Sequence, residues 1–193
     1  LVNDKNTTLM HIDFSFDTLK LGGSAFAQSL GKVGSDVPTV KNPEYFRDAF
    51  FAVQDLVKEG LILAGHDISA GGLITTLLEM TFANQKGGIE ANLNDIAEKD
   101  PVKLLFAENP GVVIQVKDAD KKDIAKMLDN AGVGYVEIGK PIDEREIVVK
   151  KDGRTRRFDI DKLRDIWYST SYRLDTKQSF NGIANLSAKD SFI

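Results

Sequence analysis

The sequence of 193 residues contains no cysteine. This excludes disulfide bonds, thiolate metal ligands and a cysteine nucleophile within the chain, and it fits a reducing compartment such as the cytoplasm, where we expect the protein. An excess of positive charge is also missing, because 25 lysines and arginines stand against 29 aspartates and glutamates, for a net charge of −4. Since phosphate backbones are bound mainly through lysine and arginine, nucleic acid is not the expected partner.

Long apolar segments are absent as well. No run approaches the roughly 18 consecutive apolar residues of a membrane-spanning helix, so no membrane partner is expected. The opening stretch, LVNDKNTTLM, is polar and lacks the basic and then apolar order of a signal peptide. It begins with leucine rather than methionine, which indicates a piece cut from a longer polypeptide.

What the chain does contain is ordinary globular composition, with 42% hydrophobic and 28% charged residues, which is enough for one good core. Hydrophobic periodicity and turn residues predict seven strands and six helices. The expected strands are 7–16, 61–67, 87–93, 111–116, 133–142 and a hairpin over 146–160, and the expected helices are 25–30, 43–59, 71–84, 100–108, 117–132 and 161–177.

Two of these predictions concern burial. The helix over 43–59 carries apolar side chains at helical spacing, which predicts that one face is buried. The run LILAGHD, at 61–67, is apolar until its last residues and is therefore expected to be a strand covered on both faces. The predicted buried face of the helix consists of Phe46, Ala49, Phe50, Val53 and Val57.

The order of elements predicts the fold class. Crossover connections are combined with one hairpin, whose turn is Asp152-Gly153, a strong hairpin signal. This combination predicts a mixed β-sheet covered by helices, that is, a layered α/β/α domain of the α+β class. The stretch from Gln178 is polar and loosely patterned, so we expect one domain over residues 1–177 and a linker over residues 178–193.

The stretch LAGHDISAGGLITTLLEM, residues 63–80, places polar residues and two glycines between an expected strand and an expected helix. The start of a helix offers free N–H groups and partial positive charge, which favour an anion. Asp67 would hold a cation such as Mg²⁺ against phosphate oxygens, Ser69 could donate to a phosphate, and Gly71 and Gly72 would permit close approach. In the structural alternative, Ser69 is the helix N-cap and Asp67 forms the turn. The stretch is neither a P-loop nor a dinucleotide fingerprint.

Other polar features also admit both a structural and a functional interpretation. LGGSAFAQ, at 21–28, is a second glycine pair before a helix and a second candidate anion site. Glu108 lies in what we interpret as a polar loop before a strand. The basic hairpin tip KKDGRTRR, at 150–157, is either solvated or a contact for an acidic partner surface. His66 could orient Asp67, as groups around a metal site orient its ligands.

Several motifs together resemble one family. HDISAGGL resembles the HDxSxGGL motif of the formylglycinamidine ribonucleotide synthases, also called phosphoribosylformylglycinamidine synthases. LGGSAFAQ with the following DVP loop, LLFAENPGVVIQV and IWYSTSYRLD occur in the order of that family, from Thr8 to Asp175. Long single-chain members carry an AIR synthetase-like unit twice. The chain is similar to the carboxyl-terminal half of the second unit, which implies a mixed and partly ferredoxin-like sheet.

The resemblance also implies a function. The family converts formylglycinamide ribonucleotide to formylglycinamidine ribonucleotide with ATP and glutamine in de novo purine biosynthesis. This part would hold an auxiliary ADP (or ATP) with Mg²⁺ and scaffold the enzyme, without a catalytic residue and without activity of its own. Its partners would be the nucleotide-binding half and the glutamine amidotransferase of the same polypeptide. The alternatives are the same domain of another AIR synthetase-superfamily enzyme and a purely structural binding module.

Carried over to this chain, the resemblance assigns roles to the residues of the motif. Asp67 is expected to be a Mg²⁺ ligand, Ser69 to contact the nucleotide or the metal, and the two glycines to let the nucleotide approach. His66 is expected to support Asp67. Many members of the family have aspartate where this chain has Ala70, so one carboxylate of the loop is missing here.

Overall fold

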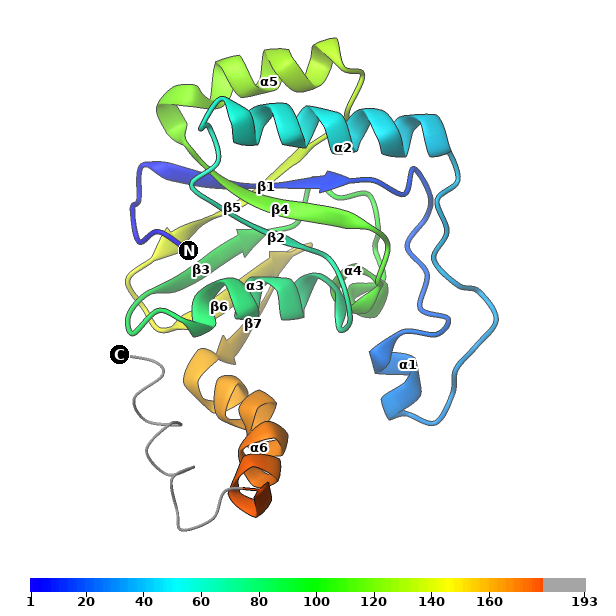
Figure 1. Cartoon of the computed structure of the whole chain (residues 1–193), viewed down its shortest axis with the longest axis vertical. Coiled ribbons are helices and arrows are strands. Elements are labelled where there is room, and N and C mark those ends of the chain that lie inside the picture. Colours follow the sequence, from blue (N-terminus) through cyan, green and yellow to red (C-terminus); the bar gives the residue numbers. More distant parts are fainter. Residues whose placement is uncertain (179–193) are drawn as a thin grey trace.

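The computed structural model describes residues 1–178 of the chain. Within that range, seven β-strands and six α-helices follow one another in the order predicted from the sequence (Figure 1). The strands are β1 (Thr7–Asp13), β2 (Ala64–Asp67), β3 (Gly88–Asn92), β4 (Gly111–Lys117), β5 (Val136–Ile142), β6 (Glu146–Lys151) and β7 (Arg154–Asp159). The helices are α1 (Ala25–Ser29), α2 (Pro43–Lys58), α3 (Gly72–Phe82), α4 (Pro101–Phe106), the 3₁₀ turn η1 (Asp118–Asp120), α5 (Lys121–Asn130) and α6 (Ile160–Gln178).

The strands form a single mixed sheet in the order β2-β4-β1-β5-β3-β6-β7. Neighbouring strands are antiparallel except β3 and β6, which pair in parallel. The strands β2, β4, β1 and β5, together with α2 and α5, have the order and directions of a ferredoxin-like βαββαβ unit. The segment from α3 to α4 is inserted into this unit, between β2 and β4. The prediction of a mixed, partly ferredoxin-like sheet is therefore confirmed.

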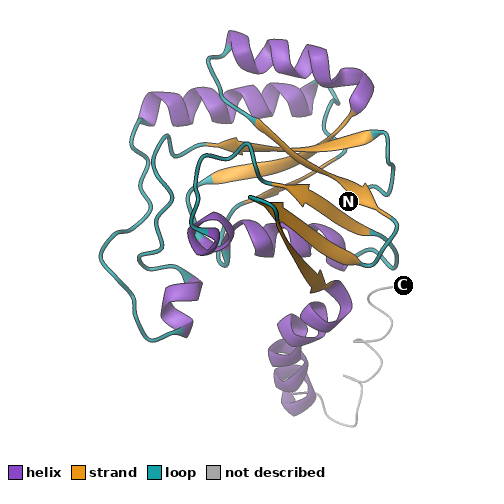
Figure 2. Ribbon diagram, turned by 180° about the vertical axis from the view of Figure 1, so that it is seen from behind, coloured by secondary structure: helices purple, strands orange, loops and turns teal. Residues whose placement is uncertain are grey.

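Helices cover the sheet on both faces, and alternate residues of the central strands point to opposite cores. Leu9 of β1 and Val113 of β4 belong to a core shared with α3 and α4. Met10, Ile12 and Ile114 belong to the other core, shared with α2 and α5. This alternation follows from the period of two in a β-strand. Figures 1 and 2 show the resulting three layers, with α2 and α5 on one side of the sheet and α3 on the other.

The predicted buried face of α2 was wrong in part. Ala49 and Val53 are buried as expected, but Phe50 is 43% and Val57 is 53% exposed. Ala52 and Leu56 fill the core in their place, so the true face is rotated toward them. The sequence allowed both faces, because apolar residues continue around the helix; the contact with the sheet and with α5 selects one.

The prediction that β2 is covered on both faces was also wrong. β2 is the outermost strand on its side of the sheet and pairs with β4 alone. Gly65 and Asp67 are exposed, while Ala64 and His66 are partly buried. An edge strand lacks a neighbour on one side, and local sequence does not report which strand ends a sheet. This edge position brings the end of β2 to the surface.

The hairpin between β6 and β7 is confirmed. Asp152 and Gly153 have φ angles of 48° and 73°, as the turn type expected of an Asp-Gly pair requires. β7 leads directly into α6, whose Trp167 ring lies 5.5 Å from that of Phe82. The predicted linker, apart from Gln178 at the end of α6, lies outside the described residues. No helix in the described part of the chain is both long and apolar enough to cross a membrane.

Two neighbours on α2 test the corrected face. Leu56 is fully buried and Val57 is 53% exposed. Leu56→Ala should therefore lower the free energy of unfolding by about 2–5 kcal/mol, since it leaves a cavity in the core. Val57→Ala should change it by less than about 0.5 kcal/mol. Urea denaturation of both variants measures the difference, and equal losses would contradict the assignment.

Candidate functional site

The turn between β2 and α3 brings the predicted site residues to the surface. Pairing with β4 holds β2 in place, and Ile68 N–H donates to the carbonyl of Gly111 at 2.8 Å just beyond the last paired residue. The Asp67 side chain is 71% exposed, and Ser69 is exposed as well. The motif therefore presents a carboxylate and a hydroxyl outward from a backbone that the sheet fixes.

His66 lies between two carboxylates. Its Nδ1 donates to the backbone carbonyl of Asp67 at 2.8 Å and is 3.4 Å from the Asp67 carboxylate. Its Nε2 is 3.3 Å from a carboxylate oxygen of Glu79 on α3. An imidazole in this position can hold the Asp67 main chain and side chain relative to α3. The geometry is compatible with a supporting role for His66, which stays a prediction.

The two glycines of the motif have reasons within the fold. Gly71 has a φ of 91°, and a Cβ there would lie 2.2 Å from the Thr75 hydroxyl oxygen. A Cβ on Gly72 would lie 2.7 Å from the backbone carbon of Phe106 at the end of α4. Gly72 therefore lets α3 pack directly on the backbone of α4. Their role toward a nucleotide remains a prediction, in addition to this packing.

The structural alternative for Ser69 was wrong. The N-cap of α3 is Gly71, which provides no side-chain cap. Ser69 contributes its backbone carbonyl, which accepts from Gly72 N–H at 3.0 Å. Within residues 1–178, the Ser69 hydroxyl forms no hydrogen bond. An exposed hydroxyl without an internal partner is free to contact a ligand.

Sequence reasoning missed the role of Glu108. Its Oε1 accepts from Gly71 N–H at 2.8 Å and from Ala25 N–H at 2.7 Å, so one carboxylate joins the starts of α3 and α1. The Glu108 carboxylate thus already binds an N–H group in each of the two glycine-pair turns that were candidate anion sites. The sequence showed two helix starts with free N–H groups, but nothing in it showed that the two starts lie close enough to share one carboxylate. A phosphate at Asp67 would lie near two carboxylates and would need a cation.

One residue of the turn lies in place to serve as a ligand for that cation. Among residues 1–178, no three histidine, aspartate or glutamate side chains are grouped so as to hold a metal ion. The exposed carboxylate of Asp67 offers hard oxygen atoms, which Mg²⁺ prefers. Asp67 fits Mg²⁺ as one ligand of a set, and the other ligands would have to come from outside the described residues.

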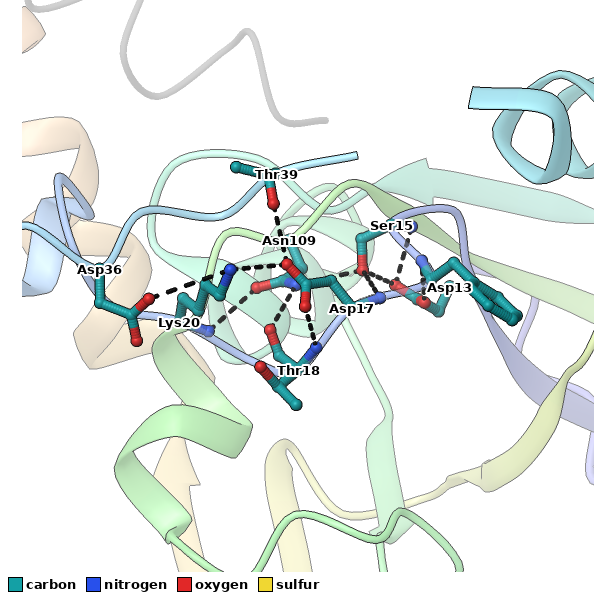
Figure 3. A network of polar contacts seen from close by, with 9 residues as sticks. Asp13, Ser15, Asp17, Thr18, Lys20, Asp36, Thr39 and Asn109 are labelled. Atoms are coloured by element: carbon teal, nitrogen blue, oxygen red, sulfur yellow. Dashed lines mark hydrogen bonds and ion pairs between the residues drawn. The ribbon is translucent and has the colours of Figure 1, made fainter. Parts of the chain in front are cut away.

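A cleft of about 810 Å³ lies next to this turn. Ile68 and Leu73 form one side of it, and residues of the loop after β1 form another. Asn109, which is buried, fixes that loop: its side chain accepts from Lys20 N–H at 3.2 Å and donates to Ser15 Oγ and to the carbonyl of Thr18, both at 3.1 Å (Figure 3). The cleft therefore has a rigid polar wall.

Asp17 strengthens the same wall. It accepts from Lys20 Nζ at 2.6 Å and from the Thr39 hydroxyl at 2.8 Å (Figure 3). The hydrogen bonds from Lys20 and Thr39 hold the pKa of Asp17 well below its usual range. The carboxylate thus stays ionised and ties the loop after β1 to the segment that leads into α2.

The described fold defines a class: a layered α+β domain with an exposed polar turn at one edge of its mixed sheet. The sequence model of the family described as AIR synthase related protein, C-terminal domain, matches residues 14–152. The chain belongs to this family.

Named relatives agree with the resemblance found in the motifs. The chain is 37% identical over 172 residues to a probable phosphoribosylformylglycinamidine synthase, chloroplastic/mitochondrial, of Arabidopsis thaliana, which covers 88% of this chain and 12% of the relative. It is 33% identical over 175 residues to the human phosphoribosylformylglycinamidine synthase, covering 89% of this chain and 13% of the relative. The chain therefore spans about an eighth of the length of these relatives. The predicted resemblance to this family is confirmed.

Solved structures confirm the fold. T. maritima PurL complexed with ATP superimposes with a TM-score of 0.63 and 15% identity over 84% of this chain and 26% of that chain. E. coli HypE, a hydrogenase maturation protein, superimposes with a TM-score of 0.53 and 19% identity over 81% of this chain and 50% of that chain. At these identities the likeness concerns the fold alone.

Replacing Glu108 tests whether it joins the two helix starts. Glu108→Ala should lower the free energy of unfolding by about 1–3 kcal/mol, because two N–H groups lose a charged acceptor. Amide hydrogen exchange should accelerate at Ala25 and Gly71 together. Glu98→Ala is the control, since within residues 1–178 Glu98 accepts only from the neighbouring Lys99 and Asp100 N–H groups. Unchanged exchange at Ala25 and Gly71 in Glu108→Ala would contradict the proposed link.

His11, which lines the cleft, predicts a pH dependence. Burial lowers the pKa of His11 below its ordinary value of 6.5, against the opposing effect of the Asp13 charge. As the pH falls below 6.5, the unfolded chain binds a proton that the folded chain does not, so the free energy of unfolding should fall. His11→Gln should remove this part of the slope in urea titrations between about pH 6.5 and 5. His66→Gln is the control. If the free energy of unfolding has the same pH slope in His11→Gln as in the wild type and in His66→Gln, the assignment of this slope to His11 is contradicted.

Proposed function

We propose that the chain is part of a phosphoribosylformylglycinamidine synthase, the ligase that makes formylglycinamidine ribonucleotide from formylglycinamide ribonucleotide with ATP and glutamine in de novo purine biosynthesis. The observation that carries this proposal is the identity of 32–37% to enzymes of that name over 88–93% of the chain. The structures of the neighbour PurL with ATP and with FGAR agree with it. Because the chain spans 12–14% of these relatives, it supplies one part of the whole enzyme.

The β2–α3 turn is the part of this chain that we assign to a nucleotide. In this proposal Asp67 is a Mg²⁺ ligand, Ser69 donates to a phosphate, and His66 holds Asp67 in place. Bound Mg²⁺ would neutralise phosphate charge, which the proximity of Glu108 makes necessary. The outward position of Asp67 and the free hydroxyl of Ser69 support this assignment, because both can reach a ligand held by another segment.

The rest of the role follows from the same proposal. The nucleotide is an auxiliary ADP (or ATP) whose site is completed by the nucleotide-binding half of the polypeptide, and no catalytic residue lies in this chain. A cleft made by two halves loses most of its contacts when one half is absent, so the chain alone is inactive.

Residues 1–177 form the domain, and residues 178–193 lead to the glutamine amidotransferase. The absence of cysteine supports this arrangement, because the amidotransferase nucleophile must then lie elsewhere. The whole enzyme would act in the cytoplasm.

Substitution of Asp67 in the full-length polypeptide tests the auxiliary role. In Asp67→Asn, most of the rise in melting temperature that ADP with Mg²⁺ gives the wild type should be lost, because one metal ligand is weakened. The turnover number should fall by less than about threefold, since the substitution leaves the reacting groups in place. Asp129→Asn, at an exposed position of α5, is the charge-matched control and should behave as the wild type. A large fall in turnover number with an unchanged melting shift would instead make Asp67 part of the catalytic site.

A further inference from the structure

A second pocket lies at the opposite edge of the sheet from β2. It is lined by residues of the β6–β7 hairpin and of α4. It has a volume of about 230 Å³. Its floor is apolar and belongs to the core: Leu104, Leu105 and Val149 are only 3–4% exposed as residues. β7 is the last strand of the sheet at this end (Figure 1), and Arg154 and Arg156 of β7 line the pocket. No residue of the β2–α3 turn lines this pocket, but Lys99 and Leu104 also line the cleft of about 810 Å³ beside that turn. The proposed nucleotide role makes no use of the pocket.

The rim of this pocket is basic. Lys99, Lys151, Arg154 and Arg156 line it, and Asp152 is the one acidic residue in the lining. The chain as a whole has a net charge of −4, so this concentration of positive charge runs against its composition. Positive charges brought together around an apolar floor repel one another and are stabilised by a bound anion.

The alternation of the hairpin sorts its cations into two groups. On the face away from the pocket, Lys150 pairs with Glu90 at 2.7 Å and Arg157 pairs with Glu146. On the pocket face, Lys151 Nζ donates to two backbone carbonyls, those of Leu93 at 3.2 Å and Ile96 at 2.6 Å. Lys151 is thus fixed in place by neutral groups and lacks a carboxylate partner in the described part of the chain.

The other cations of the rim are also without counterions. Within residues 1–178, the side chains of Lys99, Arg154 and Arg156 form no ion pair. Two acidic residues next to the pocket are already used locally: Glu98 accepts from two backbone N–H groups and Asp100 caps α4. Asp152, the acidic residue of the lining, leaves the rim with an excess of three positive charges. Three exposed, positively charged side chains, those of Lys99, Arg154 and Arg156, therefore surround one apolar hollow together with the tethered Lys151.

The size of the hollow decides which anion fits. Pockets that enclose drug-sized ligands measure about 300–1,000 Å³. At about 230 Å³, this hollow would not enclose a nucleotide but has room for one apolar side chain. An apolar side chain flanked by carboxylates matches both the floor and the rim. Residues 179–193 do not provide such a segment, because their only charged residues are Lys189 and Asp190.

We propose that this pocket docks an acidic segment of a partner domain outside the chain, with one apolar side chain on the floor and flanking carboxylates on the rim. The unneutralised rim and the side-chain-sized floor together carry this proposal. Arg154 and Arg156 lie on the edge strand, where they can meet a segment that runs alongside β7. The inference holds whatever reaction the parent polypeptide performs.

Peptide binding to the 193-residue chain tests the proposal. The probe is a fluorescent pentapeptide with a central phenylalanine and two acidic residues on each side, measured by fluorescence anisotropy at low salt. The double variant Arg154→Gln, Arg156→Gln should weaken its binding about tenfold or more, because two charge-assisted contacts are lost. Lys122→Gln with Lys126→Gln, on the exposed side of α5, removes the same charge elsewhere and should change binding less than about twofold. Circular dichroism melting shows that both double variants are folded.

Two competitors separate this occupant from others. The same peptide with a central serine should bind about tenfold more weakly, because the apolar floor stays empty. Inorganic pyrophosphate should compete poorly. The proposal is overturned if the phenylalanine peptide does not bind at about 1 mM, if both double variants weaken binding equally, or if pyrophosphate competes as well as the peptide, which would make the pocket a small-anion site.

Discussion

The antiparallel pairing of β1 with β4 is the constraint on which the rest of the structure depends. It runs without interruption from Thr7 opposite Lys117 to Asp13 opposite Gly111. Both strands are central and buried on both faces. Their pairing register therefore determines which of their side chains enter each of the two separate cores. The same pairing also positions the chain segments next to its Asp13–Gly111 end. The loop that follows β1 and the segment that precedes β4 leave the sheet side by side, so that Asn109 reaches the loop and Glu108 reaches two helix starts. The polar wall of the cleft and the geometry of the Asp67 turn both follow from this register.

Electrostatics then decides what the Asp67 turn can hold. A helix start beside two glycines is often taken as a phosphate site in its own right. Here the N–H groups at the starts of α1 and α3 already share the Glu108 carboxylate. The turn therefore offers negative rather than positive charge to a ligand, through Glu108 and the exposed Asp67. A phosphate can bind beside them only together with a cation, and the hard oxygens of Asp67 suit Mg²⁺. The charges of the turn therefore favour the metal–nucleotide site that we propose.

Much of the fold could be predicted from the sequence, because local patterns determine which residues form helices, strands and turns. The order of all elements and the Asp152-Gly153 hairpin are examples. Choices made by tertiary contacts could not be predicted. Phe50 and Leu56 are both apolar, and only packing against the sheet shows that Leu56 is the buried one. The predicted strand 61–67 begins with an apolar run, and only the strand order shows that β2 lies at an edge. The function of Glu108 was hidden for a related reason: its partners are backbone N–H groups, which every residue has, and their meeting depends on the packing of α1 and α3.

The two charged features of the surface differ in sign but share one physical property. At the β2–α3 turn, the Asp67 carboxylate faces outward, and no lysine or arginine pairs with it in the described part of the chain. At the pocket beside the β6–β7 hairpin, Lys99, Arg154 and Arg156 are exposed without an ion pair in the described part of the chain, while Lys150 and Arg157 on the opposite face of the hairpin are neutralised by Glu90 and Glu146. The hairpin thus has the means to neutralise its own charges and does so on one face only. In a domain that worked alone, charges of one sign gathered at an apolar hollow would only cost stability. In the larger polypeptide that we propose, other segments can supply the missing counterions at these positions.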